Sequence, residues 1–113
     1  MKKQMFTMAI GLALASTAAI ANAAMNADEI SDAQSAFMNN GCSGCHSATD
    51  TLVGPSLQDI AKRYKGDKEQ AEVAHRIRTG SSGRWGDGMH PANESIEPDD
   101  AKLLAKWILN GAP

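Results

Sequence analysis

The stretch Cys42-Ser43-Gly44-Cys45-His46 contains both cysteines of this 113-residue chain. If it turns once as a helix, Cys42, Cys45 and His46 stand at positions i, i+3 and i+4, which puts two thiols and one imidazole on a single face. A C-x-x-C-H run is the attachment sequence of c-type haem, where each thiol adds to one vinyl group and the histidine reaches the iron. The stretch therefore predicts one covalently bound haem c, with Cys42 and Cys45 as its thioethers and His46 as an axial ligand.

Three other interpretations of these residues explain less. A zinc site would need two further ligands at ordinary spacing, but the chain has no third cysteine, and His75 and His90 lie 29 and 44 residues beyond His46. A redox dithiol of the thioredoxin kind would need a strand before it and a βαβ context after it, and the sequence has neither. A disulfide across two intervening residues would stabilise little, because the loop that it closes is short.

The N-terminal segment, residues 1–23, has the pattern of a cleaved signal peptide. Lys2-Lys3 form a basic start, residues 5–20 are apolar and rich in alanine, and Ala21-Asn22-Ala23 has the small-x-small form that a signal peptidase recognises. A membrane anchor is the alternative, but the apolar run is short and contains three hydroxyl side chains. We expect cleavage after Ala23, with Ala24 as the alternative position, export to the periplasm, and no permanent membrane anchor.

Cleavage would leave residues 24–113 as one small domain of 90 residues. Such a chain buries only about 60 to 65% of its unfolded surface, so its own core is thin and a haem would fill it. Without Lys2-Lys3 the domain has 9 basic and 13 acidic residues, a formal charge of −4. This charge argues against nucleic acid as a partner and favours association through local patches.

Apolar residues at helical spacing predict four helices and no strand, so the fold class is all-α. Capping residues and stop glycines place the helices between Asn26 and Gly41, from Ser56 to Tyr64, from Lys68 to Thr79, and from Pro98 to Gly111. We expect Trp107 to pack across Phe37. The residues expected on the inner faces are Ile30, Ala33, Phe37 and Met38; Leu57, Ile60 and Ala61; Ala71, Ala74 and Ile77; and Ala101, Leu104, Trp107 and Ile108.

Two irregular segments complete the predicted site. In the loop at residues 52–55, a backbone carbonyl near Pro55 could accept the Nδ1–H of His46 and fix its ring. The glycine-rich loop at residues 80–93 has no period, and it carries a methionine, Met89, that can reach the haem as its second axial ligand. Ligation by two histidines, with His90 or His75 in place of Met89, remains an alternative.

Taken in order, these segments resemble a small class I cytochrome c of the bacterial cytochrome c-551 (c-8) type over residues 26–110. The resemblance rests on Asn40-Gly41-Cys42-Ser43-Gly44-Cys45-His46, Val53-Gly54-Pro55, Arg76-Ile77, Gly80-Ser81, Trp85-Gly86, Met89 and Leu104-Ala105-Lys106-Trp107.

The resemblance implies a class I cytochrome c fold of about four helices around one haem c, with His46 and Met89 as axial ligands. It also implies that the Pro55 carbonyl holds His46, and that Arg76 and Trp85 hydrogen-bond a haem propionate. The chain departs from close relatives at the second ligand, because His90 stands where they have proline. By strict count the asparagine that often binds the methionine sulfur falls at Ala92, which leaves Asn93 as the candidate for that role.

The function implied is that of a periplasmic one-electron carrier, not an enzyme. Its redox partners would dock transiently at an exposed haem edge of a monomer. The donor would be a protein such as a quinol-cytochrome c reductase, and the acceptor a nitrite reductase or terminal oxidase. The alternatives are a haem enzyme or gas sensor with an open sixth position, and a small haem domain docked permanently to a larger complex.

Overall fold

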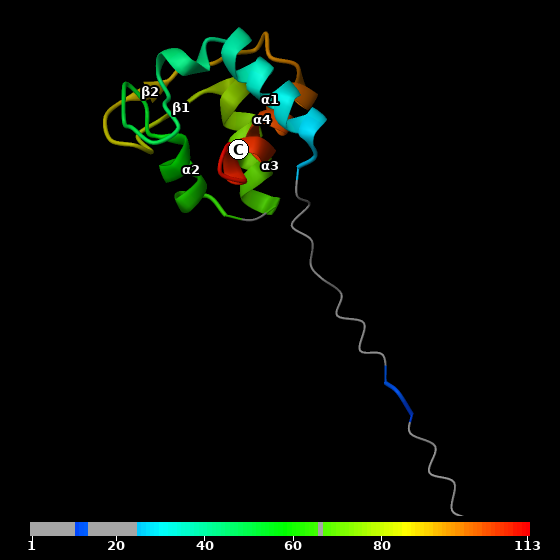
Figure 1. The fold of residues 1–113 in the computed structure, drawn as a ribbon. Helices are drawn as coiled ribbons and strands as arrows, with labels where there is room; N and C mark the ends of the chain where they lie inside the picture. The colour runs from blue at the N-terminus through cyan, green and yellow to red at the C-terminus, as the bar shows by residue number, and fades with distance from the viewer. Residues whose placement is uncertain (1–10, 14–24, 66) are drawn as a thin grey trace, which may run out of the picture.

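The computed structural model describes residues 11–13, 25–65 and 67–113. The predicted signal peptide at residues 1–23 lies outside the described residues, apart from residues 11–13. In the part of the chain that is described, no helix is both long and apolar enough to cross a membrane. The elements in chain order are α1 (Ala27–Asn39), the 3₁₀ turn η1 (Cys42–Gly44), α2 (Leu57–Arg63), α3 (Asp67–Thr79), β1 (Ser81–Ser82), β2 (Met89–His90) and α4 (Pro98–Leu109), as Figure 1 shows.

The helices begin at the capping residues that the sequence indicates. At α1, Asn26 Oδ1 accepts the Glu29 N–H at 2.9 Å, and the Glu29 carboxylate accepts the Asn26 N–H at 3.1 Å, which completes a capping box. At α2, Ser56 Oγ accepts the Asp59 N–H at 3.1 Å. Pro98 occupies the first turn of α4, where its missing N–H costs no hydrogen bond. The four predicted helices are therefore present, with ends close to those expected.

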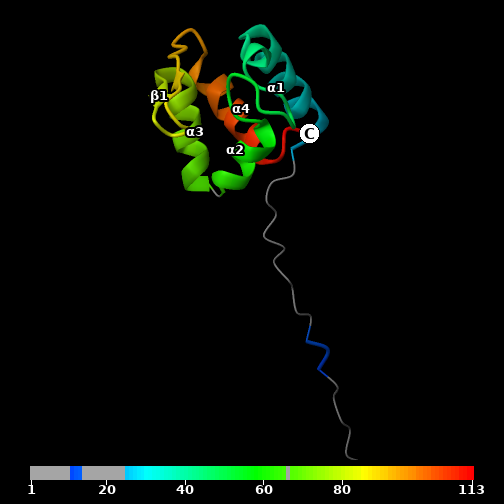
Figure 2. The same cartoon turned by 90° about the vertical axis from the view of Figure 1, so that its left-hand side faces the viewer.

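Helix α4 is the centre of the core, because it packs against α1, α2 and α3 (Figures 1 and 2). Leu104 is 1% exposed, and the predicted crossing of Trp107 with Phe37 is present, with ring centroids 5.4 Å apart. A tilted aromatic pair of this kind stabilises the α1–α4 contact beyond its buried area. The buried apolar residues are Ala33, Phe37, Leu57, Tyr64, Val73, Ala74, Ile96, Ala101, Leu104, Ala105, Trp107 and Ile108.

The prediction that Met38 and Ala71 lie on the inner faces of their helices is wrong. Met38 is 62% exposed, because the α1 stripe consists of Ala33 and Phe37, four residues apart, and the residue after Phe37 turns away from that face. Ala71 is exposed while Val73 is buried, so the inner face of α3 is rotated relative to our prediction.

The C-terminal residue Pro113 is hydrogen-bonded to the α1–α4 pair. The Pro113 carbonyl accepts Trp107 Nε1–H at 2.9 Å and Gln34 Nε2–H at 3.0 Å, and Figure 2 shows the C-terminus beside α1. Lys106 Nζ donates to Glu29 Oε1 at 2.9 Å. The contacts of Gln34 with Pro113 and of Glu29 with Lys106 join residues far apart in sequence and hold the N-terminal part of α1 against α4.

Candidate haem site

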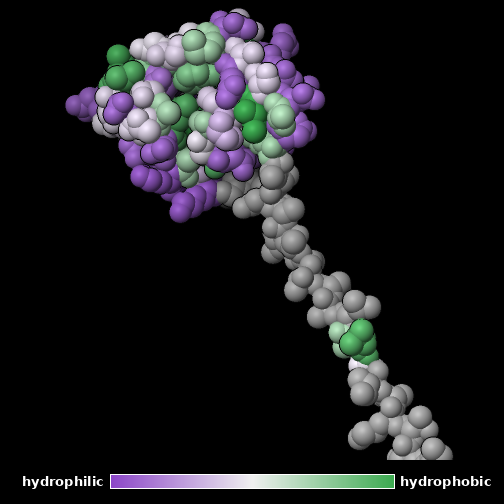
Figure 3. Space-filling view, viewed as in Figure 1, coloured by the Kyte–Doolittle hydropathy of each residue, from purple (hydrophilic) through white to green (hydrophobic). Residues whose placement is uncertain are grey.

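All four helices contribute side chains to one cavity of about 520 Å³. This volume lies in the range of small-molecule and cofactor sites. On the face of the molecule drawn in Figure 3, apolar side chains lie among the polar ones. The cavity is lined by every residue to which the sequence assigned a role at the haem, namely Cys42, Cys45, His46, Pro55, Arg76, Trp85 and Met89, and also by His90 and Asn93.

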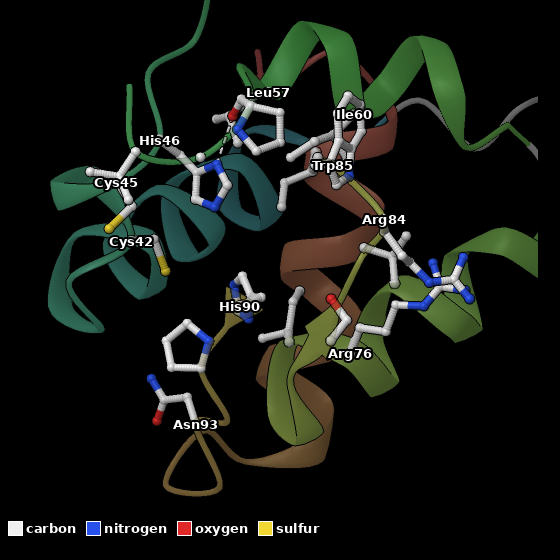
Figure 4. A pocket seen from close by; sticks show the side chains of 18 of the residues that line it. Cys42, Cys45, His46, Leu57, Ile60, Arg76, Arg84, Trp85, His90 and Asn93 are labelled. Carbon is white, nitrogen blue, oxygen red and sulfur yellow. Dashed lines mark hydrogen bonds between the residues drawn. The ribbon is translucent and has the colours of Figure 1, made fainter. Parts of the chain in front are cut away.

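The cysteine motif folds as the predicted single turn. Gly41 precedes it with a φ of 72°, a left-handed conformation that favours glycine. The N–H groups of Cys45 and His46 both donate to the Cys42 carbonyl, at 3.1 and 3.0 Å. This turn brings both thiols and the imidazole to the wall of the cavity (Figure 4).

The environment of the Cys42 thiol speaks against a redox dithiol. Both cysteines are free, with Cys42 half-buried and Cys45 exposed. Burial raises the pKa of the Cys42 thiol, and the neighbouring Cys45 adds to the effect, although a backbone hydrogen bond opposes it. Reactive cysteines of redox motifs have lowered pKa values, because the thiolate is the nucleophile. Cys42 lacks that property.

The ring of His46 is held from two sides. Its Nδ1 lies 2.7 Å from the Pro55 carbonyl oxygen (Figure 4), and since a carbonyl only accepts, Nδ1 carries a proton, so the neutral ring has its lone pair on Nε2. Gly54 lies flat against the ring, where an added Cβ would be 2.6 Å from His46 Cε1. The hydrogen bond from Gly54 N–H to the Cys45 carbonyl, at 2.8 Å, fastens this loop to the motif. The ring is thus oriented as a metal ligand through Nε2.

A second wall of the cavity is cationic and aromatic. Arg76 is largely buried and donates through Nη2 to Glu72, but its Nη1 and the Tyr64 hydroxyl are buried without a hydrogen-bond partner among the described residues. The Arg76 guanidinium lies 5.3 Å from the centre of the Tyr64 ring. The Trp85 ring meets Tyr64 edge-on at 6.3 Å. Two buried donors without an acceptor fit a carboxylate, so this wall suits a haem propionate.

Sequence reasoning missed Tyr64 as a site residue. It entered the prediction only as the end of a helix, although a buried tyrosine normally needs a partner for its hydroxyl. That requirement was the available signal. The structure brings Tyr64 together with the two residues that the sequence did predict here, Arg76 and Trp85.

Strand β2 provides two candidate ligands on the wall opposite the motif. The Met89 side chain is 77% exposed. The His90 ring lies with its centroid 6.1 Å from that of His46, at an interplanar angle of 32°. Desolvation by the surrounding protein atoms lowers the pKa of His90, and the neighbouring His46 lowers it further, although a backbone hydrogen bond at Pro91 opposes this. His75 does not line the cavity.

Asn93, the candidate partner of a ligand sulfur, is engaged elsewhere in this structure. Its Oδ1 accepts the Ser95 hydroxyl at 2.7 Å, and its N–H donates to the Arg78 carbonyl at 3.0 Å. Its expected role toward Met89 stays a prediction.

Comparisons with known proteins agree with this geometry. The family model described as Cytochrome c matches residues 30–112. Cytochrome c-551 of Pseudomonas aeruginosa is 40% identical over 80 residues, covering 70% of this chain and 76% of the relative. Cytochrome c-551 of Stutzerimonas stutzeri is 36% identical over 112 residues, covering 97% of this chain and 98% of the relative.

Among solved structures, the crystal structure of Nitrosomonas europaea cytochrome c552 superposes with a TM-score of 0.66 at 39% identity, covering 69% of this chain and 98% of the other. Sequence, fold and cavity therefore agree. The chain belongs to the cytochrome c family, as a small class I member of the cytochrome c-551 type that binds one covalent haem c.

Proposed function

We propose that this monohaem electron carrier works in the periplasm, where it takes electrons from a donor such as a quinol-cytochrome c reductase and passes them to a nitrite reductase or terminal oxidase. Haem c, when bound, supplies one electron in its ferrous form and accepts one in its ferric form. The protein's residues position this group, set its potential and expose its edge to partners. They do not bind or transform a substrate.

The observation that carries the proposal is the hydrogen bond of 2.7 Å between His46 Nδ1 and the Pro55 carbonyl, beside both cysteines. Cys42 and Cys45 would hold the ring covalently, and His46 would bind the iron through Nε2. The Pro55 carbonyl keeps the proton on Nδ1 and increases the basicity of the ligand nitrogen. A ligand locked in this way limits the rearrangement of the site between oxidation states, which favours rapid electron transfer.

The cationic and aromatic wall supports the assignment of the propionate site. Arg76, Trp85 and Tyr64 would bind one propionate, with Arg76 Nη1 and the Tyr64 hydroxyl as buried donors. A guanidinium that pairs with the carboxylate removes the cost of leaving a charge in a partly buried place. The same positive charge near the ring favours the ferrous form electrostatically.

Apolar residues around the cavity suit brief contacts with partner proteins. Val53 and Trp85 line the cavity while remaining 86% and 40% exposed, and Met89, which we propose as the second axial ligand, lines it as well. A small apolar patch beside a redox group fits weak, short-lived complexes. We propose that partners dock here onto a monomer without a permanent anchor.

The periplasmic location rests on the N-terminal segment. Residues 1–23 have the basic start, apolar run and small residues of a signal peptide. The match to S. stutzeri cytochrome c-551 covers 97% of this chain, so it includes most of this segment.

The proposal is tested by expressing the full chain in a bacterium that attaches haem c, and by fractionating the cells. We expect a periplasmic monomer whose mass equals the chain from Ala24 onward plus one haem. It should show a reversible one-electron reduction and no rapid binding of carbon monoxide to the ferrous form. The Cys42→Ser/Cys45→Ser variant is the control and should lack covalent haem. Rapid carbon monoxide binding by the wild type would instead indicate an open site, as in a haem enzyme or gas sensor.

A further inference from the structure

We propose that Arg63 is a positioning residue of the haem site, which holds the Trp85 indole in place as a hydrogen-bond donor to a haem propionate. The inference rests on the proposed function, in which Arg76, Trp85 and Tyr64 bind that propionate. It deepens that function, because hydrogen bonds around the haem help to set the reduction potential of the carrier.

The loop of residues 83–88, which carries Trp85, has little support of its own. A Cβ at Gly83 or at Gly86, one on each side of this segment, would meet nothing within 4 Å. In the described part of the chain, no backbone–backbone hydrogen bond outside the helices and strands involves residues 83–88. The backbone of the loop therefore does not fix the position of the Trp85 ring.

Arg63, the last residue of α2, fastens this loop at two points. Its Nη1 donates a hydrogen bond to the carbonyl of Arg84, the residue immediately before Trp85. Its guanidinium also lies over the Trp85 ring, 4.6 Å from the ring centre. A guanidinium is attracted to the face of an indole, and its flat shape stacks there as a lysine ammonium does not. One side chain thus holds both the Trp85 ring and the backbone before it.

Arg63 lies behind the wall that we assign to the propionate. Trp85, Tyr64 and Arg76 line the cavity, whereas Arg63 does not. The Arg63 guanidinium is 5.4 Å from the centre of the Tyr64 ring, which meets the Trp85 ring edge-on at 6.3 Å. Figure 4 shows Trp85 and Arg76 on the side of the cavity away from Cys45. Arg63 therefore acts on the site through Trp85 and not by direct contact with the cavity.

The neighbouring residue provides a matched control. Lys62 is also a basic residue in the last turn of α2, but its side chain is 75% exposed and pairs with Asp59 at 3.9 Å. Arg63→Gln and Lys62→Gln remove the same charge from the same helix end, and only the first removes the contacts with Trp85. Trp85→Phe keeps a ring in the loop and removes its N–H. These variants, and the double variant Arg63→Gln/Trp85→Phe, are made in the full chain and purified with haem attached.

The first readout is the hydrogen exchange of the two indole N–H groups, measured by NMR on the ferrous protein. We expect Arg63→Gln to speed the exchange of the Trp85 indole about tenfold, because a loosened ring leaves its acceptor more often. Lys62→Gln should leave this rate unchanged. Trp107, whose Nε1–H donates to the Pro113 carbonyl at 2.9 Å, is the reference in the same spectrum and should keep its rate in both variants.

The second readout is the reduction potential. The Trp85 N–H offsets part of the negative charge of the propionate, and a weaker offset favours the ferric state. Arg63→Gln should therefore lower the potential more than Lys62→Gln does. Because Arg63 acts through Trp85, its substitution in the Trp85→Phe background should lower the potential only as much as Lys62→Gln does.

An unchanged Trp85 exchange rate in Arg63→Gln would overturn the inference, as would equal acceleration of both indoles, which indicates a general loss of stability. Fully additive shifts of potential in the double variant would overturn it too, because the Arg63 charge would then act directly on the haem. In each case the wild type would still carry covalent haem and the proposed function would stand. A purified wild type without covalent haem would overturn the proposed function itself, and this inference with it.

Discussion

Gly54 lies so close to the His46 ring that a methyl group has no room between them. An added Cβ would be 2.6 Å from Cε1 and 3.0 Å from Nδ1. We therefore predict that Gly54→Ala displaces the ring and weakens its hydrogen bond to the Pro55 carbonyl. A less basic imidazole stabilises the ferric state less, so the reduction potential should rise by about 60 mV, the equivalent of a tenfold change in relative affinity for a one-electron couple.

Redox titration of the haem protein measures this shift. Gly44→Ala is the control, because a Cβ at Gly44 meets nothing within 4 Å. It should leave the potential unchanged. Equal potentials for Gly54→Ala and the wild type would mean that the His46–Pro55 hydrogen bond survives or does not influence the iron.

Some site residues could be predicted from the sequence because their chemistry depends on local spacing. Cys42, Cys45 and His46 share one turn, and the Pro55 carbonyl follows nine residues after His46. The sequence could indicate that the Tyr64 hydroxyl needs a partner, but not that Tyr64 lies beside Arg76, since this depends on how the end of α2 packs in three dimensions. Met89 and His90 are neighbours in the sequence and both line the cavity, so spacing along the chain does not separate them as candidate ligands.

At the scale of elements, α1 and α4 are joined by the ion pair of Glu29 and Lys106, 2.9 Å apart. The hydrogen bond from Lys106 lowers the pKa of Glu29, and the Asn26 N–H lowers it further, from an ordinary value of 4.5. A carboxylate with a lowered folded-state pKa stabilises the fold above the unfolded-state pKa, and the stabilisation is lost as the pH falls through the folded-state pKa. Both side chains are partly exposed, so solvent screens the pair and the effect is small.

We predict that Glu29→Gln lowers the urea midpoint of the haem protein slightly at pH 7, and that the difference from the wild type shrinks as the pH falls through the lowered folded-state pKa of Glu29. Lys106→Gln removes the same pair without altering the capping box and should show the same pH dependence. A difference that stays the same at every acidic pH at which the protein remains folded would assign the loss to helix capping and not to the ion pair.

Helices and strands differed in how far the sequence predicted them. The helices carry local signals, such as the Asn26–Glu29 capping box and the Pro98 start, which act within one turn. Strands β1 and β2 have two residues each and no alternation to detect. They form because Gly80 allows the chain to turn closely against residues 90–92, a contact between distant residues that periodicity cannot reveal.

At the scale of the whole molecule, the four helices surround a cavity that opens beside one buried apolar cluster. Phe37, Leu57, Leu104 and Ile108 belong to the buried cluster and also line the cavity. A small domain buries a modest share of its surface, so a bound ring contributes apolar contacts that the chain alone lacks. The predicted inner faces of the helices were therefore largely right, because the same apolar stripes serve the protein core and the cofactor.

The exposed residues at the cavity determine how two such molecules meet. Val53 is 86% exposed and lines the cavity, so two copies that exchange electrons through this face bring their Val53 side chains close together. We predict that Val53→Glu slows electron self-exchange about tenfold, because like charges at a contact oppose association. The reduction potential should change little. The rate is measured from NMR line broadening in mixtures of ferrous and ferric protein.

Met38→Glu is the matched control, since Met38 is 62% exposed and does not line the cavity. Equal slowing by both variants would mean that overall charge controls the encounter and that transfer does not depend on this face.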